Sequence, residues 1–269
     1  MRFIPEPLAS IYVVAVGLVL GSFLNVCIHR LPLGLSVVRP RSRCPGCGED
    51  IRWYQNIPVL SWAVLRGRCA GCRQPISIRY PFVEALSAAL CLAAWLIYGA
   101  TPAFPIAAGF ALAMVVLFFT DYDHQLLPDA ITLSGLVVGL AVAWFNPFLR
   151  GEEWRAVWSA LSGAAIGSGM LWGFGAIYGK LRGVEAMGLG DVKMMAMVGA
   201  FTGPAGVLFT IFGGSLVGAI FGLAMVPLRG RSLQDTLPFG CFLAPAALLA
   251  LLYSRQVADF YLSIVIPTP

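Results

Sequence analysis

The strongest constraint on this chain is an uncharged run that begins close to its N-terminus. Leu8–Ile28 contains no Asp, Glu, Lys or Arg, and as a helix it is long enough to cross a hydrocarbon core of about 30 Å. Its length and its weakly basic N-terminal flank favour an uncleaved first span over a signal peptide. Charged residues make up 12% of the 269 residues and hydrophobic residues 59%. A soluble domain of this size cannot enclose so much apolar surface, so we expect a polytopic membrane protein that does not bind nucleic acid.

Further apolar segments of roughly membrane length follow the first one. We expect an all-α protein of about eight transmembrane helices, in which the short sixth span ends at a Gly203-Pro204 turn. Glycines four residues apart recur in these segments and are expected to let helices pack closely. The segments after Leu8–Ile28 are Pro81–Tyr98, Phe104–Thr120, Ala130–Phe145, Val157–Tyr178, Val192–Thr202, Ala205–Leu228 and Pro238–Tyr253.

The basic residues gather in one loop. Half of the 18 Lys and Arg residues lie between Arg30 and Arg79, where the only acids are Glu49 and Asp50. By the positive-inside rule this loop is cytoplasmic and the N-terminus lies outside. We therefore divide the chain into a first transmembrane helix (1–28), a cytoplasmic basic loop (29–80) and a seven-helix membrane domain (81–269). Alternation of the spans places five more basic residues on cytoplasmic loops: Lys180, Arg182, Lys193, Arg229 and Arg231.

The basic loop carries two C-x-x-C motifs, Cys44–Cys47 and Cys69–Cys72. Two such knuckles supply the four thiolates of a tetrahedral structural zinc site. A redox pair or two disulfides are the alternatives, but a cytoplasmic location disfavours stable disulfides and no βαβ pattern surrounds the motifs. A loop this small buries little core, so a metal cross-link is a physically sensible stabiliser. Cys27, Cys91 and Cys241 lie in or beside spans and are expected to be packing residues.

Acidic residues near a bilayer are energetically costly and are functional candidates. Asp121, Asp123 and Asp129 lie at the predicted cytoplasmic end of the third span, and Asp191 begins the sixth on the same side. Two carboxylates at one depth can share a water molecule and a proton, as acid–base hydrolysis requires. Gly188 and Gly190, just before Asp191, would allow a substrate to approach the backbone closely.

Each acid also has a purely structural interpretation. Asp129 follows Pro128 and opens a span, which favours an N-cap. Asp123 is suited to an Asx-turn, and Asp191 to a cap at the positive end of its helix. Asp121 and Asp123 together could bind a hard cation if further oxygen ligands were present.

The motifs together resemble one family over nearly the whole chain. In order they are Gly21-Ser-Phe-Leu-Asn-Val26, His29-Arg-Leu-Pro32, the paired C-x-x-C knuckles, Asn56-Ile-Pro58, Arg79-Tyr-Pro-Phe-Val-Glu84, Asp121-x-Asp-His-Gln-Leu-Leu-Pro-Asp129, Gly188-Leu-Gly-Asp191 and Pro238-Phe-Gly240. The series is similar to that of the type IV prepilin peptidases, which are bifunctional leader peptidases and N-methyltransferases. Ala186 and Cys241 stand where many members have Gly and Pro, and we expect neither departure to touch the aspartates.

The resemblance implies a function and its residues. Asp121 and Asp191 would be the catalytic pair of a G-x-G-D aspartic protease in the bacterial inner membrane, working at its cytoplasmic face. The substrates would be prepilins and pseudopilins, bound in the lipid through their hydrophobic helix and with a short basic leader in the cytoplasm. S-adenosylmethionine would then methylate the new N-terminus. Glu84 is a candidate for that second reaction, or alternatively an ion-pair partner for an arginine of the basic loop.

Two other functional classes remain open from the residues alone. A transporter or channel with a zinc-stabilised cytoplasmic domain would use the acids as ion ligands or proton relays. Such a protein is expected to place acids near the bilayer midplane, whereas these lie at predicted helix ends. A scaffold subunit without catalysis is the third interpretation.

Overall fold

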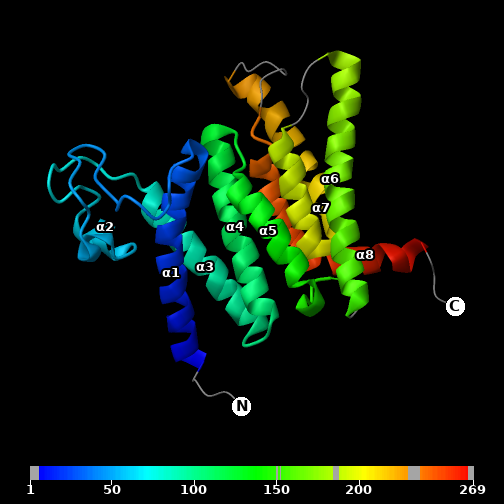
Figure 1. Cartoon of the computed structure of the whole chain (residues 1–269), viewed down its shortest axis with the longest axis horizontal. Helices are drawn as coiled ribbons and strands as arrows, with labels where there is room; N and C mark the ends of the chain where they lie inside the picture. The colour runs from blue at the N-terminus through cyan, green and yellow to red at the C-terminus, as the bar shows by residue number, and fades with distance from the viewer. Residues whose placement is uncertain (1–5, 150, 152, 184–187, 230–236, 266–269) are drawn as a thin grey trace. The chain divides into compact units, whose positions relative to one another are not determined.

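The computed structural model describes residues 6–149, 151, 153–183, 188–229 and 237–265. Ala186 and Arg231 therefore lie outside the described residues. Within them the chain is helical and contains no strand, as predicted. The elements are α1 (Glu6–Arg30), η1 (Leu31–Leu33), η2 (Trp53–Asn56), α2 (Leu60–Val64), α3 (Arg79–Tyr98), α4 (Ala103–His124), α5 (Asp129–Ala141), η3 (Ala143–Phe145), α6 (Trp154–Arg182), α7 (Leu189–Arg229) and α8 (Gly240–Val265) (Figure 1).

Five helices of the described chain are long and apolar enough to cross a membrane: α1, α3, α4, α6 and α7. Helix α5 and the apolar part of α8, Gly240–Tyr253, are shorter. The polytopic all-α fold is confirmed, while the number of eight crossings stays a prediction. The fourth predicted span ends early, because α5 stops at Ala141 and the chain continues as the 3-10 turn η3.

The chain divides into two compact units, Met1–Val116 and Leu117–Pro269, which we describe separately. In unit 1, α1 packs against α3 through small residues. A Cβ on Gly17 would meet the backbone of Ala88, and one on Gly21 would meet the backbone of Glu84. The Asn25 side chain also donates a 3.1 Å hydrogen bond to the carbonyl of Tyr80. This close packing buries Glu84 and leaves the opposite face of α1 exposed.

Helix α7 of unit 2 is a hairpin with two arms. Gly203 has φ 70° and ψ −175°, which is not helical, and glycine is the residue that adopts such a φ without strain. A Cβ on Gly167 of α6 would meet both Met195 and Val207, residues that a straight helix would separate by about 18 Å. The predicted turn at Gly203 is therefore present. The side chain of Asn146 donates a 2.9 Å hydrogen bond to the Phe201 carbonyl and so satisfies a backbone acceptor at the end of the first arm.

The first arm of α7 is the buried centre of unit 2. Met194, Met195, Met197 and Val198 are all fully buried. Close approach of α6 is possible because glycine faces glycine, since a Cβ on Gly163 would meet the carbonyl oxygen of Gly199. The predicted role of the spaced glycines in packing is confirmed here. The result is a fixed platform on which the N-terminal turn of α7, with Asp191, is presented.

Candidate functional site

A pocket of about 320 Å³ in unit 2 brings the two predicted catalytic residues together. Asp121 comes from the last turn of α4 and Asp191 from the first turn of α7. Asp121 is only 5% exposed and Asp191 is half-buried. The pocket is lined by Asp121, Gln125, Leu126, Leu127, Asp129, Gly188, Gly190 and Asp191.

The start of α8 fixes the Asp121 carboxylate. The backbone N–H of Cys241 donates a 2.9 Å hydrogen bond to Oδ2 of Asp121. Gly240 lies against the same group, and a Cβ at this position would come within 2.9 Å of Oδ2. The expectation that Cys241 is remote from the aspartates is therefore wrong. This hydrogen bond uses the backbone amide, which every residue except proline has, so the sequence carried little sign of it.

The two glycines of Gly188-Leu-Gly-Asp191 shape the other side of the pocket. Gly190 packs against Leu127: a Cβ added to Gly190 would lie 3.1 Å from the Cβ of Leu127. Gly188 lies beside the Asp191 carboxylate, with Oδ2 3.6 Å from such an atom. Side chains at these positions would occupy the space beside the acids, as the sequence interpretation of Gly188 and Gly190 requires.

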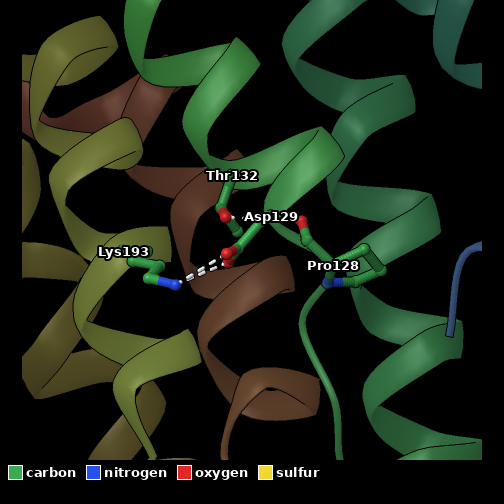
Figure 2. Close-up of polar contacts among 4 residues, drawn as sticks. All are labelled: Pro128, Asp129, Thr132 and Lys193. Atoms are coloured by element: carbon green, nitrogen blue, oxygen red, sulfur yellow. Dashed lines mark hydrogen bonds and ion pairs between the residues drawn. The ribbon is translucent and has the colours of Figure 1, made fainter. Parts of the chain in front are cut away.

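Asp129 forms an ion pair with Lys193 on the rim of the pocket. The Lys193 ammonium donates to both carboxylate oxygens, at 2.7 and 2.8 Å, and the pair links α5 to the first arm of α7 (Figure 2). Sequence reasoning missed this pair. The one sequence feature that could have indicated the pair is the position of Lys193, two residues after Asp191 of the motif.

Two sequence expectations are corrected by this pair. Asp129 is not the N-cap of α5, because Pro128 occupies that position and no side chain caps the helix. Lys193 is not in a loop, because α7 begins at Leu189 and includes it. Asp123 is exposed in the last turn of α4 and does not line the pocket.

The second predicted site lies in the basic loop of unit 1. The sulfur atoms of Cys44, Cys47, Cys69 and Cys72 all lie within 4.8 Å of one another. The Sγ atoms of Cys44 and Cys72 are 3.7 Å apart, and a tetrahedral zinc with Zn–S bonds of about 2.3 Å places its sulfurs about 3.8 Å apart. The cluster thus has the ligand set and the spacing to hold a metal ion.

The two knuckles have the same backbone geometry. Cys44 N–H donates to the Glu49 carbonyl at 3.0 Å, and Cys69 N–H donates to the Gln74 carbonyl at 2.9 Å. Each turn closes on a residue with positive φ, Gly48 at 71° and Arg73 at 62°. Hydrogen bonds from the amides of Cys47 and Gly46 lower the pKa of Cys44 to about 6, so its thiolate is available as a ligand at neutral pH.

Glu84 is buried at the start of α3 and binds the loop. Its Oε2 accepts a 2.7 Å hydrogen bond from the backbone N–H of Val59, and the Ser22 hydroxyl also hydrogen-bonds to it. Val59 has φ 61°, a conformation that is strained for a β-branched residue. Glu84 therefore stabilises the turn that follows Asn56-Ile-Pro58.

These features define a class: a polytopic helical membrane protein with a carboxylate-lined pocket and a four-cysteine cluster that could hold a metal. Residues 15–98 match the model of the bacterial peptidase A24 N-terminal domain, and residues 108–223 match that of the type IV leader peptidase family. The chain belongs to the type IV leader peptidase family.

Three relatives are named "Prepilin leader peptidase/N-methyltransferase". The protein from Myxococcus xanthus is 42% identical over 84% of this chain and 66% of its own length. The one from Pseudomonas putida is 36% identical over 90% of this chain and 89% of its own. The one from Pseudomonas aeruginosa is 37% identical over 96% and 95%. No solved structure matches the chain.

Proposed function

We propose that this protein removes the leader from type IV prepilins and pseudopilins and then N-methylates the new N-terminus. One observation carries the peptidase assignment: Asp121 and Asp191, from different helices, line one pocket, and the two glycines of the motif line it with them. The names of the relatives and the family membership support both activities. They give no support to a transporter or channel.

In the proposed cleavage, Asp121 and Asp191 act on one water molecule. One carboxylate takes a proton from the water, whose oxygen forms a bond to the scissile carbonyl carbon. The other, protonated, donates its proton to the carbonyl oxygen. The C–N bond then breaks: the leaving amine takes up the proton that the first carboxylate accepted from the water, and one hydroxyl of the tetrahedral carbon returns its proton to the second carboxylate as the C=O bond re-forms. The hydrogen bond from Cys241 would hold the Asp121 carboxylate in one orientation through these steps.

We place the reaction at the cytoplasmic face of the bacterial inner membrane. The charge of the basic loop supports this topology, in which residues 1–28 form the first span, residues 29–80 the cytoplasmic loop and residues 81–269 the membrane domain. The hydrophobic helix of the prepilin would pack in lipid beside the spans while its basic leader stays in the cytoplasm.

The metal that we assign to the four cysteines is zinc. Tetrahedral thiolate coordination is its preferred structural site, and the sulfur spacing given above fits it. Zinc would supply a cross-link between the two knuckles rather than chemistry at the scissile bond. Cys44 and Cys47 would hold it from one turn, and Cys69 and Cys72 from the other.

For methylation, S-adenosylmethionine supplies the methyl group when bound, and the acceptor is the free amine that cleavage creates. We propose that Glu84 affects this half-reaction by positioning the Val59 turn of the basic loop. A substitution that removes its acceptor should therefore lower methylation more than cleavage.

The decisive experiment incubates the full-length protein in detergent with a prepilin and labelled S-adenosylmethionine. Asp121→Asn and Asp191→Asn should each lower the rate of leader removal by about 10²–10⁴-fold. Asp123→Asn is the matched control, because Asp123 is exposed two residues away on the same helix. Leader removal at the wild-type rate by either of the first two variants would refute the aspartyl mechanism. Methyl transfer to a synthetic, already cleaved pilin tests the second activity separately.

A further inference from the structure

Unit 1 contains a second, larger pocket, which shares no lining residue with the pocket of Asp121 and Asp191. Its volume is about 720 Å³, and it lies between the C-terminal half of α1 and the basic loop. The wall from α1 is formed by Val19, Ser22, Phe23, Val26 and Arg30. The facing wall comes from segments 37–42 and 51–58 of the loop.

Three arginines give the pocket its charge. Arg30, Arg41 and Arg52 line it, and none of the lining residues is an acid. The guanidinium of Arg30 donates a 2.9 Å hydrogen bond to the carbonyl of Ser36. That of Arg52 donates a 3.0 Å hydrogen bond to the Tyr54 hydroxyl. Neither of these acceptors carries a charge, and Glu49, the acid that interacts electrostatically with Arg52, does not line the pocket. Guanidinium groups match the geometry of phosphate and of carboxylate, so the pocket is suited to an anionic group of either kind.

The pocket also extends into the apolar part of the span. Arg30 is the first Lys or Arg after the uncharged run of α1. Phe23 and Val19 lie about 10 and 16 Å from it along the helix axis. Both are exposed, Phe23 by 47% and Val19 by 61%. A ligand that fills the pocket from Arg30 to Val19 therefore has an anionic end and a long apolar end.

The loop presents large apolar side chains around the same opening. Trp53 is 81% exposed and Val38 is 77% exposed, and both line the pocket together with Tyr54. Trp and Tyr beside basic residues are typical of the region where lipid headgroups meet the hydrocarbon core. This loop surface is therefore suited to contact with a membrane.

We propose that this pocket binds an anionic phospholipid, with its phosphate between Arg30, Arg41 and Arg52 and an acyl chain along Phe23 and Val19. Basic pockets beside transmembrane helices on the cytoplasmic side are suited to such headgroups. S-adenosylmethionine fits less well, because it carries a net positive charge and the lining offers no carboxylate to its amine or sulfonium. The proposal is independent of the peptidase and methyltransferase activities.

Trp53 provides a reporter for the test. The full-length protein is reconstituted in phosphatidylcholine nanodiscs that contain a minor fraction of acyl-brominated phosphatidylglycerol or, in a parallel sample, of equally brominated phosphatidylcholine. The Trp53 signal is the difference between wild type and Trp53→Phe. We expect stronger quenching of this signal by the brominated phosphatidylglycerol, and loss of the excess in Arg41→Gln/Arg52→Gln.

The matched control is Arg66→Gln/Lys180→Gln, which removes the same charge from exposed positions outside the pocket. This variant should keep the excess quenching. Equal quenching by the two lipids in the wild type, or equal loss in both double variants, overturns the proposal. Displacement by inorganic phosphate, but not by chloride of matched ionic strength, would instead assign the pocket to a free phosphate. Displacement by S-adenosylmethionine would assign it to the cofactor. Zinc content and circular dichroism of each variant establish that it is folded.

Discussion

The backbone N–H of Cys241 donates a 2.9 Å hydrogen bond to the carboxylate of Asp121. Asp121 lies in the last turn of α4 and Cys241 in the first turn of α8, so this bond joins two helix termini that are distant in the sequence. The amide is free for this role because the first N–H groups of a helix have no acceptor within it. A proline cannot donate such a bond, so the residue at this position decides whether Asp121 is held in this way.

Gly240→Ala should disable the pocket without unfolding the protein. A Cβ there would lie 2.9 Å from Oδ2 and 3.0 Å from Cγ of Asp121, so the carboxylate must move. We expect leader removal to slow by about tenfold or more, since small misplacements of reacting groups have effects of this size. The measurement is kcat/KM on a purified prepilin. Gly213→Ala is the control, because its Cβ would make an ordinary 3.6 Å contact with Ala246.

Neutralising Lys193 should affect the pocket more than stability. Lys193 and Asp129 are 34% and 58% exposed, so loss of their ion pair should lower the free energy of unfolding by about 1 kcal/mol or less. Lys193→Met, however, leaves Asp129 as a third uncompensated carboxylate beside Asp121 and Asp191, and we expect slower cleavage.

The charge-swapped variant Asp129→Lys/Lys193→Asp checks this explanation. It should recover part of the rate lost in Lys193→Met, and Lys193→Arg should remain close to wild type. If the swap is as slow as the single variant while thermal melting is unchanged, the ion pair is not the reason for the effect.

Loss of one cluster cysteine should release the metal. Cys47→Ser removes one of four thiolates whose sulfurs lie within 4.8 Å, and its zinc content by mass spectrometry should fall well below that of the wild type. Limited proteolysis of the basic loop should accelerate because the cross-link is gone. Cys91→Ala is the control, since Cys91 is buried in α3 and outside the cluster. Unchanged zinc content in Cys47→Ser would rule out the four-thiolate site.

Glu84→Ala should loosen the loop at Val59. The substitution removes the acceptor of the 2.7 Å bond from the Val59 amide, and an unsatisfied partly buried donor costs about 1–3 kcal/mol. Because Val59 is held at φ 61°, we expect its amide to exchange faster in hydrogen–deuterium exchange. Glu84→Gln retains a carbonyl acceptor and should exchange more slowly than Glu84→Ala. Equal exchange in wild type and Glu84→Ala would show that other contacts fix this turn.

Gly163→Ala should destabilise unit 2 by overpacking. Its Cβ would meet the Gly199 carbonyl and the backbone of Gly203, and insertion of one extra carbon into such an interface costs typically about 1–3 kcal/mol. We expect a lower melting temperature. Gly169→Ala on the same helix is the control, because a Cβ there faces open space; it should melt at or slightly above the wild-type temperature, since alanine favours helix. Similar melting of both variants would contradict the close packing of α6 on α7.

The sequence determined the membrane class and the approximate helices, and it predicted the two sets of candidate functional residues that the structure brings together. These are local properties: an uncharged run is a span by its length alone, and two C-x-x-C motifs place their sulfurs by short turns. Hydropathy was less informative about the fourth span, because Val142–Phe145 is apolar but folds as a cap and 3-10 turn rather than a continuation of α5.

Only the tertiary structure decided which residues surround the acids. The amide of Cys241, the space left by Gly240 and the ion pair of Lys193 with Asp129 join segments that are far apart in the chain. A backbone amide is the same in every residue except proline, so the sequence carries almost no sign of its use as a donor. The sequence likewise does not identify which acid pairs with Lys193, and the packing of α5 against α7 makes Asp129 its partner. The sequence therefore indicates the candidate catalytic acids, and the packing of α4, α5, α7 and α8 determines their geometry.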